Sequence, residues 1–421
     1  MNVLHIYCYA PRGALPLRAS VDDLIFCWKR HAEGNRVWYV NSFFGFPKWI
    51  RRVKWDVILF NVSYLSQRWD RQLRDRFIRH GEMLRELSGI KVVLPQDEFV
   101  HTDILCDFVN AAGIDWVYTC AAECDWPTVY NTVDRTKVRF RQVLTGYLED
   151  QRIQDLERVA AEVPVRDIDV AYRAWKAAPW LGRHGQLKVK VGELFAEYAP
   201  LAGFHCDIST SDGATLYGND WYRWLLRSRY TVGVEGGASI LDRDGSLGKA
   251  TAAYEKEHPG ANFDEIEAAC FPGRDGELHL FALSPRHLEA CLTRTCQVLV
   301  EGSYNGVLEA GRHYISVKSD FSNLPEVLEQ MKDESGRLRI TENAWQDIVA
   351  SGKCSYRAFT REALTSLTEG RPPATTRHGI LYAWCRLRDA LHWKVLRVLQ
   401  WRLCKWGLAR LRRMTNRPPA S

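Results

Sequence analysis

The sequence predicts an α/β protein made of two doubly wound domains, each a parallel sheet covered by helices on both faces. One reason is size: 421 residues exceed one ordinary domain, and 46% apolar residues are enough for two cores. Another is that short, continuous apolar segments alternate with amphipathic ones along most of the chain. A polar connection near residue 165 divides this series into two halves, which predicts two domains with a cleft between them.

Residues 1–165 are expected to form the first domain. Its strands are continuous apolar runs of the kind found in sheets that are buried on both faces. The expected strands are residues 3–9, 36–40, 55–61, 90–95 and 115–119, with amphipathic helices at 22–34 and 71–89. This order is Rossmann-like, and sheets of this kind bind ligands at the carboxyl ends of their strands.

Residues 166–345 show a second alternating series and predict a second Rossmann-like domain. Its expected strands are residues 167–172, 230–236, 277–284, 296–302 and 313–318, and its expected helices are 188–199, 285–294 and 323–333. Helices within residues 346–370 are expected to cross back to the first domain.

The composition argues against several other classes of protein. The 12 cysteines are scattered without a CxxC pair, which is typical of reduced thiols in the cytoplasm rather than of a disulfide scaffold. The amino-terminal residues carry no basic region followed by an apolar core, so no signal peptide is expected. No apolar stretch reaches the roughly 18 residues that a membrane-spanning helix needs.

Residues 377–413 form a strongly basic tail. They contain ten Lys or Arg residues and a single acidic residue, so the tail contributes +9 to the net charge of +6 and the rest of the chain carries −3. Its apolar residues recur every three or four positions and share one helical face: Ile380, Trp384, Leu387, Leu391, Val395 and Val398. This pattern predicts a helix lying on an anionic membrane surface, which would hold the protein at the cytoplasmic face of the membrane. The alternative is a terminal helix that packs on the protein body or on another subunit. Nucleic acid is not an expected partner, because the positive charge is confined to the tail.

One segment of the second half has a recognisable order of elements. Residues 284–331, "SPRHLEACLTRTCQVLVEGSYNGVLEAGRHYISVKSDFSNLPEVLEQM", resemble the donor-binding end of GT-B fold glycosyltransferases, particularly the CgeB-like spore-maturation group. In that family an arginine-containing loop precedes a helix that opens with Glu-Ala, then a strand, a glycine-containing turn and another helix. The resemblance implies that Glu289 accepts hydrogen bonds from the ribose hydroxyls of a nucleotide sugar. It also implies that Arg286 faces the diphosphate together with free N–H groups of the helix. The alternative is that Glu289 only stabilises the first turn of its helix.

Other basic residues are further candidates for the phosphates. The segment "WLGRHGQLKVKVGELF" resembles the Gly-Arg, four residues, Lys arrangement of the same superfamily, which implies that Arg183 and Lys188 neutralise the donor phosphates. Arg173, where a predicted strand ends, is an alternative partner, and a solvated basic helix start would need no ligand. Glu301 and Glu309 copy the glutamate spacing of many retaining GT-B enzymes. The glycines between them predict a turn, so we treat the spacing as accidental and keep Glu301 as a candidate that reaches the cleft from its strand end.

The segment "RYTVGVEGGASILDRDGSL" supplies a catalytic candidate. Glu235 follows a predicted strand and precedes two glycines, which let a backbone approach a ligand closely. We expect Glu235 near the transferred sugar, with Asp242 as a second polar contact. The "DRDG" sequence resembles a calcium loop, but Ala253 stands where such a loop needs glutamate, so no metal site is expected. A tight turn at Gly245 is the alternative.

The first domain is expected to hold the acceptor. Asp97 and His101 follow a buried predicted strand, and a carboxylate or imidazole there would take the proton from an acceptor hydroxyl. The alternative is that Asp97 caps the following helix.

Taken with the resemblance, these residues predict a metal-independent glycosyltransferase that needs no cofactor besides its nucleotide-sugar substrate. The acceptor is expected to be a glycan or a lipid-linked sugar, and the resemblance implies retention of the anomeric configuration. Two alternatives stay open: an epimerase or phosphorylase on the same fold, and a catalytically inactive relative that binds a glycan or organises a membrane assembly.

Overall fold

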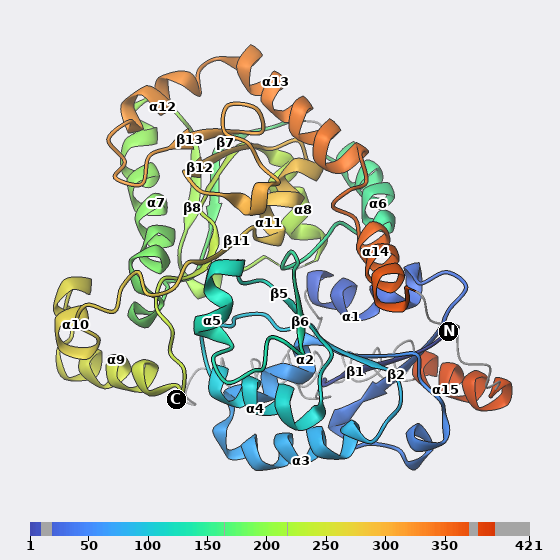
Figure 1. Ribbon diagram of the computed structural model, residues 1–421. Coiled ribbons are helices and arrows are strands. Elements are labelled where there is room, and N and C mark those ends of the chain that lie inside the picture. Colours follow the sequence, from blue (N-terminus) through green and yellow to red (C-terminus); the bar gives the residue numbers. More distant parts are fainter. Residues whose placement is uncertain (10–18, 164, 217, 370–377, 392–421) are drawn as a thin grey trace, which may run out of the picture.

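The computed structural model describes residues 1–9, 19–163, 165–216, 218–369 and 378–391. The first domain contains a six-stranded parallel sheet of order β2-β1-β3-β4-β5-β6 (Figure 1). Its strands are β1 (Asn2–Tyr7), β2 (Arg36–Asn41), β3 (Val57–Phe60), β4 (Ile90–Val93), β5 (Trp116–Thr119) and β6 (Arg139–Gln142). All neighbours in it are parallel, as the continuous apolar runs predict.

Helices cover both faces of this sheet because alternate residues of each strand point to opposite sides. In β3, Ile58 and Phe60 pack toward α3 (Arg74–Arg85) and α4 (Thr102–Ala112). Val57 and Leu59 pack toward α1 (Ala19–His31) and α14 (Tyr356–Thr368). Two short helices, α2 (Val62–Leu65) and α5 (Trp126–Val129), follow the ends of β3 and β5, and α6 (Asp150–Ala161) leads to the second domain.

The second domain contains a five-stranded parallel sheet of order β13-β12-β9-β7-β8. Its strands are β7 (Ile168–Arg173), β8 (Cys206–Ser209), β9 (Ser228–Gly233), β12 (Cys296–Val300) and β13 (Tyr314–Val317). Its helices are α7 (Gly182–Leu201), α8 (Asn219–Arg227), α11 (Pro285–Leu292), α12 (Leu324–Gln330) and α13 (Glu334–Ala344). The predicted fold class, two Rossmann-like α/β domains, is thereby confirmed.

One predicted strand lies elsewhere than in the main sheet. Residues within 277–284 form β11 (Leu280–Ala282), which pairs antiparallel with β10 (Gly236–Ala238) in a separate two-stranded sheet. The connection between β10 and β11 carries α9 (Ser246–Glu257) and α10 (Phe263–Cys270), which extend from the domain beside α7 (Figure 1). Residues 280–283 read Leu-Phe-Ala-Leu, a short apolar run like those of the main strands, so the sequence pattern does not distinguish this strand from one of the main sheet.

The two domains contact each other through loops that follow their strands. The N–H of His101 donates to the carbonyl of Asp242 at 3.0 Å, and the N–H of Asp242 donates to the carbonyl of Phe99 at 2.8 Å. Farther along, the hydroxyl of Thr145 donates to the carbonyl of Leu283 at 2.6 Å. The loops after β4 and β6 of the first domain therefore face the segments around β10 and β11 of the second.

After α13 the chain returns to the first domain. Leu148 and Cys354 lie side by side, joined by a backbone hydrogen bond of 2.8 Å, and α14 then packs beside α1 (Figure 1). Phe359 of α14 contacts Trp28 of α1, with ring centroids 5.5 Å apart.

The first part of the basic tail forms α15 (Gly379–Leu391), which lies beside β2 (Figure 1). The residues that pack against the first domain are Leu381, Tyr382 and Cys385. The predicted apolar face is not the packed one: Ile380, Trp384, Leu387 and Leu391 are exposed. The predicted face also includes Val395 and Val398, which lie outside the described residues. In the part of the chain that the structure describes, no helix has the length and apolar character to cross a membrane.

Candidate functional site

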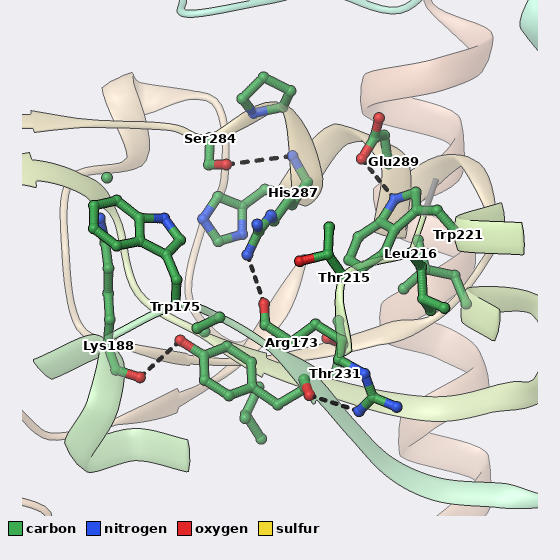
Figure 2. A pocket seen from close by; sticks show the side chains of 18 of the residues that line it. Arg173, Trp175, Lys188, Thr215, Leu216, Trp221, Thr231, Ser284, His287 and Glu289 are labelled. Atoms are coloured by element: carbon green, nitrogen blue, oxygen red, sulfur yellow. Dashed lines mark hydrogen bonds between the residues drawn. The ribbon is translucent and has the colours of Figure 1, made fainter. Parts of the chain in front are cut away.

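A pocket of about 680 Å³ lies in the second domain (Figure 2). It is bordered by Tyr172–Trp175 at the end of β7 and by Thr231–Val234 at the end of β9. After β7 the chain adds β8 on one side, and it then returns to add β9 on the other. The pocket is therefore at the point where the strand order reverses, which is where open parallel sheets bind ligands.

Glu289 lines this pocket from α11. Its carboxylate accepts hydrogen bonds from the indole N–H of Trp221 at 2.8 Å and from the hydroxyl of Tyr222 at 3.1 Å, both on α8. Burial raises the pKa of Glu289, while these two donors and the charge of Arg286 act in the opposite direction. Two carboxylate oxygens have about four acceptor positions, so the two protein donors leave capacity for a ligand.

Lys188 lines the pocket from the side opposite Glu289, beside Trp175 (Figure 2). The side chain is half-buried, and burial together with the nearby Arg286 lowers its pKa. Among the described residues no hydrogen bond or ion pair is made by its ammonium group. A half-buried cation without a direct ion pair favours the binding of an anion.

Arg286 is the second cation of the pocket. Its guanidinium donates to the carbonyl of Arg173 at 2.6 Å and lies over the ring of Trp221, 5.6 Å from the centroid. Arg286 also makes the electrostatic contact with Lys188 described above. Two positive side chains held close together in one pocket destabilise each other, and a bound anion would relieve that repulsion.

The first turn of α11 differs from the expectation of free N–H groups. Pro285 has no N–H, and the N–H groups of Arg286 and His287 both donate to Ser284, to its hydroxyl at 3.4 Å and its carbonyl at 3.0 Å. His287 itself is buried at the pocket wall, where its Nδ1 pairs with the side chain of Gln297 at 2.9 Å. The charge for an anion therefore comes from side chains rather than from these N–H groups.

Arg173 also borders the pocket. Its guanidinium binds the carboxylate of Asp207 at 2.5 Å and lies over Trp224, 4.8 Å from the ring centroid. The Asp207 carbonyl accepts a further hydrogen bond from it at 2.8 Å. These contacts direct its charge toward β8, and Arg173 positions Arg286 through its carbonyl.

Arg183 and Glu301 do not line the pocket. The Arg183 guanidinium is exposed and pairs with Asp264 at 2.8 Å and Glu267 at 2.6 Å, both on α10. Glu301 is exposed, and its carboxylate accepts from the N–H and the hydroxyl of Ser319 at 2.9 and 2.8 Å, which lowers its pKa. The structure does not bring either residue together with Glu289, and we do not assign them to the donor.

Glu235 is buried and turned toward the segment after β12. Its carboxylate accepts from the N–H of Tyr304 at 2.6 Å and from the N–H and hydroxyl of Ser303 at 3.3 and 3.2 Å. A Cβ at position 302 would lie 2.3 Å from this carboxylate, so a larger residue there would have to displace the Glu235 side chain. Burial raises the pKa of Glu235. Through these contacts Glu235 stabilises the turn at Ser303, and its carboxylate does not reach the pocket.

His101 and Asp242 meet at the domain contact, away from the pocket. The imidazole of His101 packs on Gly245, where an added Cβ would come within 2.1 Å of the ring. Asp242 accepts from the N–H groups of Leu247 and Gly248 at 3.1 and 2.8 Å and so caps α9. Gly245 has a positive φ of 79°, as the tight-turn alternative predicts. Among the described residues, no three His, Cys, Asp or Glu side chains gather as metal ligands.

Asp97 is the first-domain candidate whose charge interacts with a residue that lines the pocket, Lys188. Its side chain is exposed, yet enough protein surrounds it for burial to raise its pKa, against the charges of Arg68 and Lys188. The interaction with Lys188 crosses the domain boundary. Asp97 has a positive φ of 53°, which is uncommon for a residue other than glycine and is found often at functional sites.

Sequence reasoning missed the groups that hold these residues in place. Arg68 is fully buried and donates to the carbonyls of Gln96 at 2.6 Å and Asp97 at 3.1 Å, which fixes the loop that carries Asp97. Trp221 and Tyr222 orient Glu289 from a distant segment. A lone arginine 29 positions before Asp97 has no local pattern that reveals this role, and aromatic residues on an amphipathic helix are usually core residues.

Comparisons with known proteins give similarity at the level of structure. No protein-family model and no curated protein sequence matches the chain. Anabaena HepE in complex with UDP is 13% identical, with a TM-score of 0.45 over 87% of this chain and 100% of that one. A glycosyltransferase from Rickettsia africae is 9% identical, with a TM-score of 0.44 over 87% of this chain and 98% of the other. A sucrose-phosphate synthase from Thermosynechococcus elongatus is 10% identical, with a TM-score of 0.45 over 87% and 98%.

Proposed function

We propose that this protein is a glycosyltransferase, which binds a nucleotide-activated sugar in the pocket of the second domain and transfers the sugar to an acceptor at the first domain. The observation that carries the proposal is the convergence of one carboxylate, Glu289, and two cations, Lys188 and Arg286, in a pocket where the strand order reverses. The resemblance of residues 284–331 to GT-B glycosyltransferases points to the same ligand.

The three side chains match the parts of a nucleoside diphosphate. A carboxylate with free acceptor positions suits the vicinal hydroxyl groups of a ribose, and Glu289 has such positions beside its two protein donors. Lys188, across the pocket, and Arg286 suit the diphosphate. A volume of about 680 Å³ is within the range of pockets that bind molecules of this size.

The same cations would act on the reaction itself. In the transfer, the bond between the anomeric carbon and the diphosphate oxygen breaks, and that oxygen gains negative charge. Lys188 and Arg286 stabilise this charge in place, so no metal ion is required for that purpose. The acceptor hydroxyl loses its proton as its oxygen bonds to the anomeric carbon. Asp97, whose pKa is raised and whose charge interacts with that of Lys188 across the domain boundary, is the residue that we assign to this proton.

Two finer features of the reaction follow from the resemblance. We propose that the acceptor is a glycan or a lipid-linked sugar and that the anomeric configuration is retained. Proton NMR of the product reports the configuration directly, because the coupling constant of the anomeric proton differs between the two outcomes. Activity that is unchanged by EDTA would support transfer without a metal ion.

The binding test uses a panel of UDP, GDP, TDP and their sugar conjugates with calorimetry. Replacing Glu289→Gln removes a charged acceptor and should weaken the preferred nucleotide about tenfold or more, since hydrogen bonds to charged groups contribute about 1.5–3 kcal/mol each. Lys188→Met should lower the affinity for the nucleotide by a similar factor and change the affinity for the nucleoside little. Glu301→Gln is the matched control, because Glu301 is an exposed carboxylate of the same domain outside the pocket.

Each outcome separates the candidate functions. Slow hydrolysis of the donor sugar by the wild type, lost in Asp97→Asn but with nucleotide binding retained, supports the transferase. Nucleotide binding without turnover with any donor or acceptor would instead support a catalytically inactive relative that only binds. Equal nucleotide affinity of the wild type and Glu289→Gln would contradict the proposed site.

A further inference from the structure

The helix α15 has two different faces. One face is docked on the first domain: Tyr382 contacts Trp38, with ring centroids 5.0 Å apart, and Cys385 is 5% exposed. The ammonium of Lys29 binds the carboxylate of Asp389 at 2.8 Å and fixes the end of the helix. These contacts set the rotation of the helix about its axis, and therefore decide which residues point outward.

The outward face of α15 is apolar. Ile380, Trp384, Leu387 and Leu391 are 91, 52, 69 and 51% exposed, and their spacing of four, three and four places them in one stripe. Single exposed apolar residues are normal on soluble proteins, but a contiguous stripe marks an interaction surface. Arg388 lies over the ring of Trp384, 5.4 Å from its centroid, so positive charge borders the stripe.

The strand β2, against which α15 packs, begins a basic segment of the first domain. Residues 36–54 contain five Lys or Arg residues and no acidic residue. Four of these basic side chains, Lys48, Arg51, Arg52 and Lys54, are exposed. The short helical turn Lys48–Arg52 is anchored by Trp49, whose ring lies 5.4 Å from Trp38, the same residue that α15 packs against.

We propose that the stripe of α15 and the basic segment 36–54 together form a surface that binds an anionic lipid bilayer. The apolar stripe would enter the boundary between headgroups and acyl chains, while Lys and Arg side chains contact lipid phosphates. The exposed Phe43 and Phe44, in the same segment, add aromatic rings of the kind that anchor proteins at this depth. This surface is independent of the proposed donor pocket, which lies in the other domain.

The charges favour a membrane over two other occupants. With Arg386 and Arg388, the segment 36–54 and α15 contain seven Lys or Arg residues. A second copy meeting it by twofold symmetry would oppose these charges with identical ones. Residues 392–421, the following part of the chain, are the other possible occupant. They contain eight Lys or Arg and no acidic residue, so the basic surface would repel them as well. An anionic bilayer attracts all of these groups.

The test is vesicle flotation of the full chain with phosphatidylcholine alone and with phosphatidylcholine mixed with phosphatidylglycerol. The wild type should float with the mixed vesicles, to a lesser extent at high salt, and remain unbound with phosphatidylcholine alone. The variant Trp384→Glu, Leu387→Glu and the variant Arg51→Glu, Arg52→Glu should each lower the partition coefficient at least tenfold. These residues are exposed, so the melting temperature should change little.

Matched controls place the same changes on the second domain. Leu201→Glu alters an apolar residue that is 81% exposed on α7, and Lys249→Glu with Lys256→Glu reverses two exposed charges on α9. Both controls should bind mixed vesicles as the wild type does. Wild-type flotation of the two test variants would overturn the proposal. Light scattering that shows a wild-type dimer, dissociated by Trp384→Glu and Leu387→Glu, would overturn it in favour of a second copy.

Discussion

At the scale of single residues, buried groups of the first domain hold the loop that carries Asp97. The guanidinium of Arg68 holds the carbonyls of Gln96 and Asp97, and the carboxylate of Glu98 lies in the same buried region. Glu98 accepts hydrogen bonds from the hydroxyls of Thr119 and Tyr130, the latter at 2.8 Å. The loop that carries Asp97 is therefore fixed from inside, which explains how a residue with positive φ persists there.

Glu98 gives a prediction about pH. Burial raises the pKa of Glu98 from 4.5 to about 7. Because the folded protein holds this proton more tightly than the unfolded chain, the stability from Glu98 is present below pH 4.5 and is lost as the pH rises to about 7. A shift of this size corresponds to roughly 3 kcal/mol.

The measurement compares urea unfolding of the wild type and Glu98→Gln between pH 4.5 and 8. Glutamine does not titrate, so the free energy of unfolding of the wild type should fall by roughly 3 kcal/mol relative to the variant across this range. The constant offset between the two proteins is not diagnostic, since the amide leaves one buried donor to satisfy. Parallel pH profiles for the two proteins would show that Glu98 does not titrate in this range.

At the scale of elements, two carboxylates that resemble catalytic groups are structural supports. The side chain of Asp242 accepts hydrogen bonds from the first turn of α9, and its main chain donates and accepts backbone hydrogen bonds across the domain contact. Glu235 holds the turn that follows β12. Both side chains are nearly inaccessible, with 1 and 2% of their surface exposed. Each connects an element to a distant loop, which is why these short segments have fixed positions beside the pocket.

The cap on α9 can be tested by replacing Asp242→Ala. The N–H groups of Leu247 and Gly248 would lose their acceptor, and the free energy of unfolding should fall by about 1–3 kcal/mol. Chemical denaturation monitored by tryptophan fluorescence gives this value. Glu257→Ala, at the exposed last position of the same helix, should stay within about 0.5 kcal/mol of the wild type. A similar loss in both variants would show that the effect does not come from the cap.

At the scale of the whole molecule, the chain closes on itself. The helix α14 follows the second domain in sequence but belongs to the core of the first, where Tyr356, Phe359 and Leu364 pack with Trp28. Phe359 also stacks on Tyr147, with ring centroids 4.6 Å apart. The first domain therefore lacks part of its core until the residues after the second domain are in place.

This closure predicts that Phe359→Ala destabilises the first domain. Removing a large buried side chain should lower the free energy of unfolding by about 3–5 kcal/mol. Hydrogen exchange should then show faster exchange in α1 and β1, although both lie more than 300 residues earlier in the sequence. Thr365→Ala, an exposed position of the same helix, serves as the control. Unchanged exchange in α1 would mean that α14 contributes little to that core.

The sequence alone determined the two α/β domains and part of the candidate site. Strand and helix periodicities are local properties, so the alternation of apolar runs and amphipathic segments was enough to predict two parallel sheets. The resemblance of residues 284–331 pointed to Glu289 and Arg286, and that of the segment around Gly182 pointed to Lys188; the structure places all three at one pocket.

Only the tertiary structure decided which charged groups face that pocket. Glu235 and Arg183 also follow strand or loop signals, but residues from other parts of the chain bind them. The N–H of Tyr304 donates to the carboxylate of Glu235, and the guanidinium of Arg183 pairs with Glu267. The docking of α15 was decided in the same way, because Trp38 and Lys29 select which face of an amphipathic helix is buried. A side chain's direction depends on the partners that the fold brings to it, and these partners are not adjacent in the sequence.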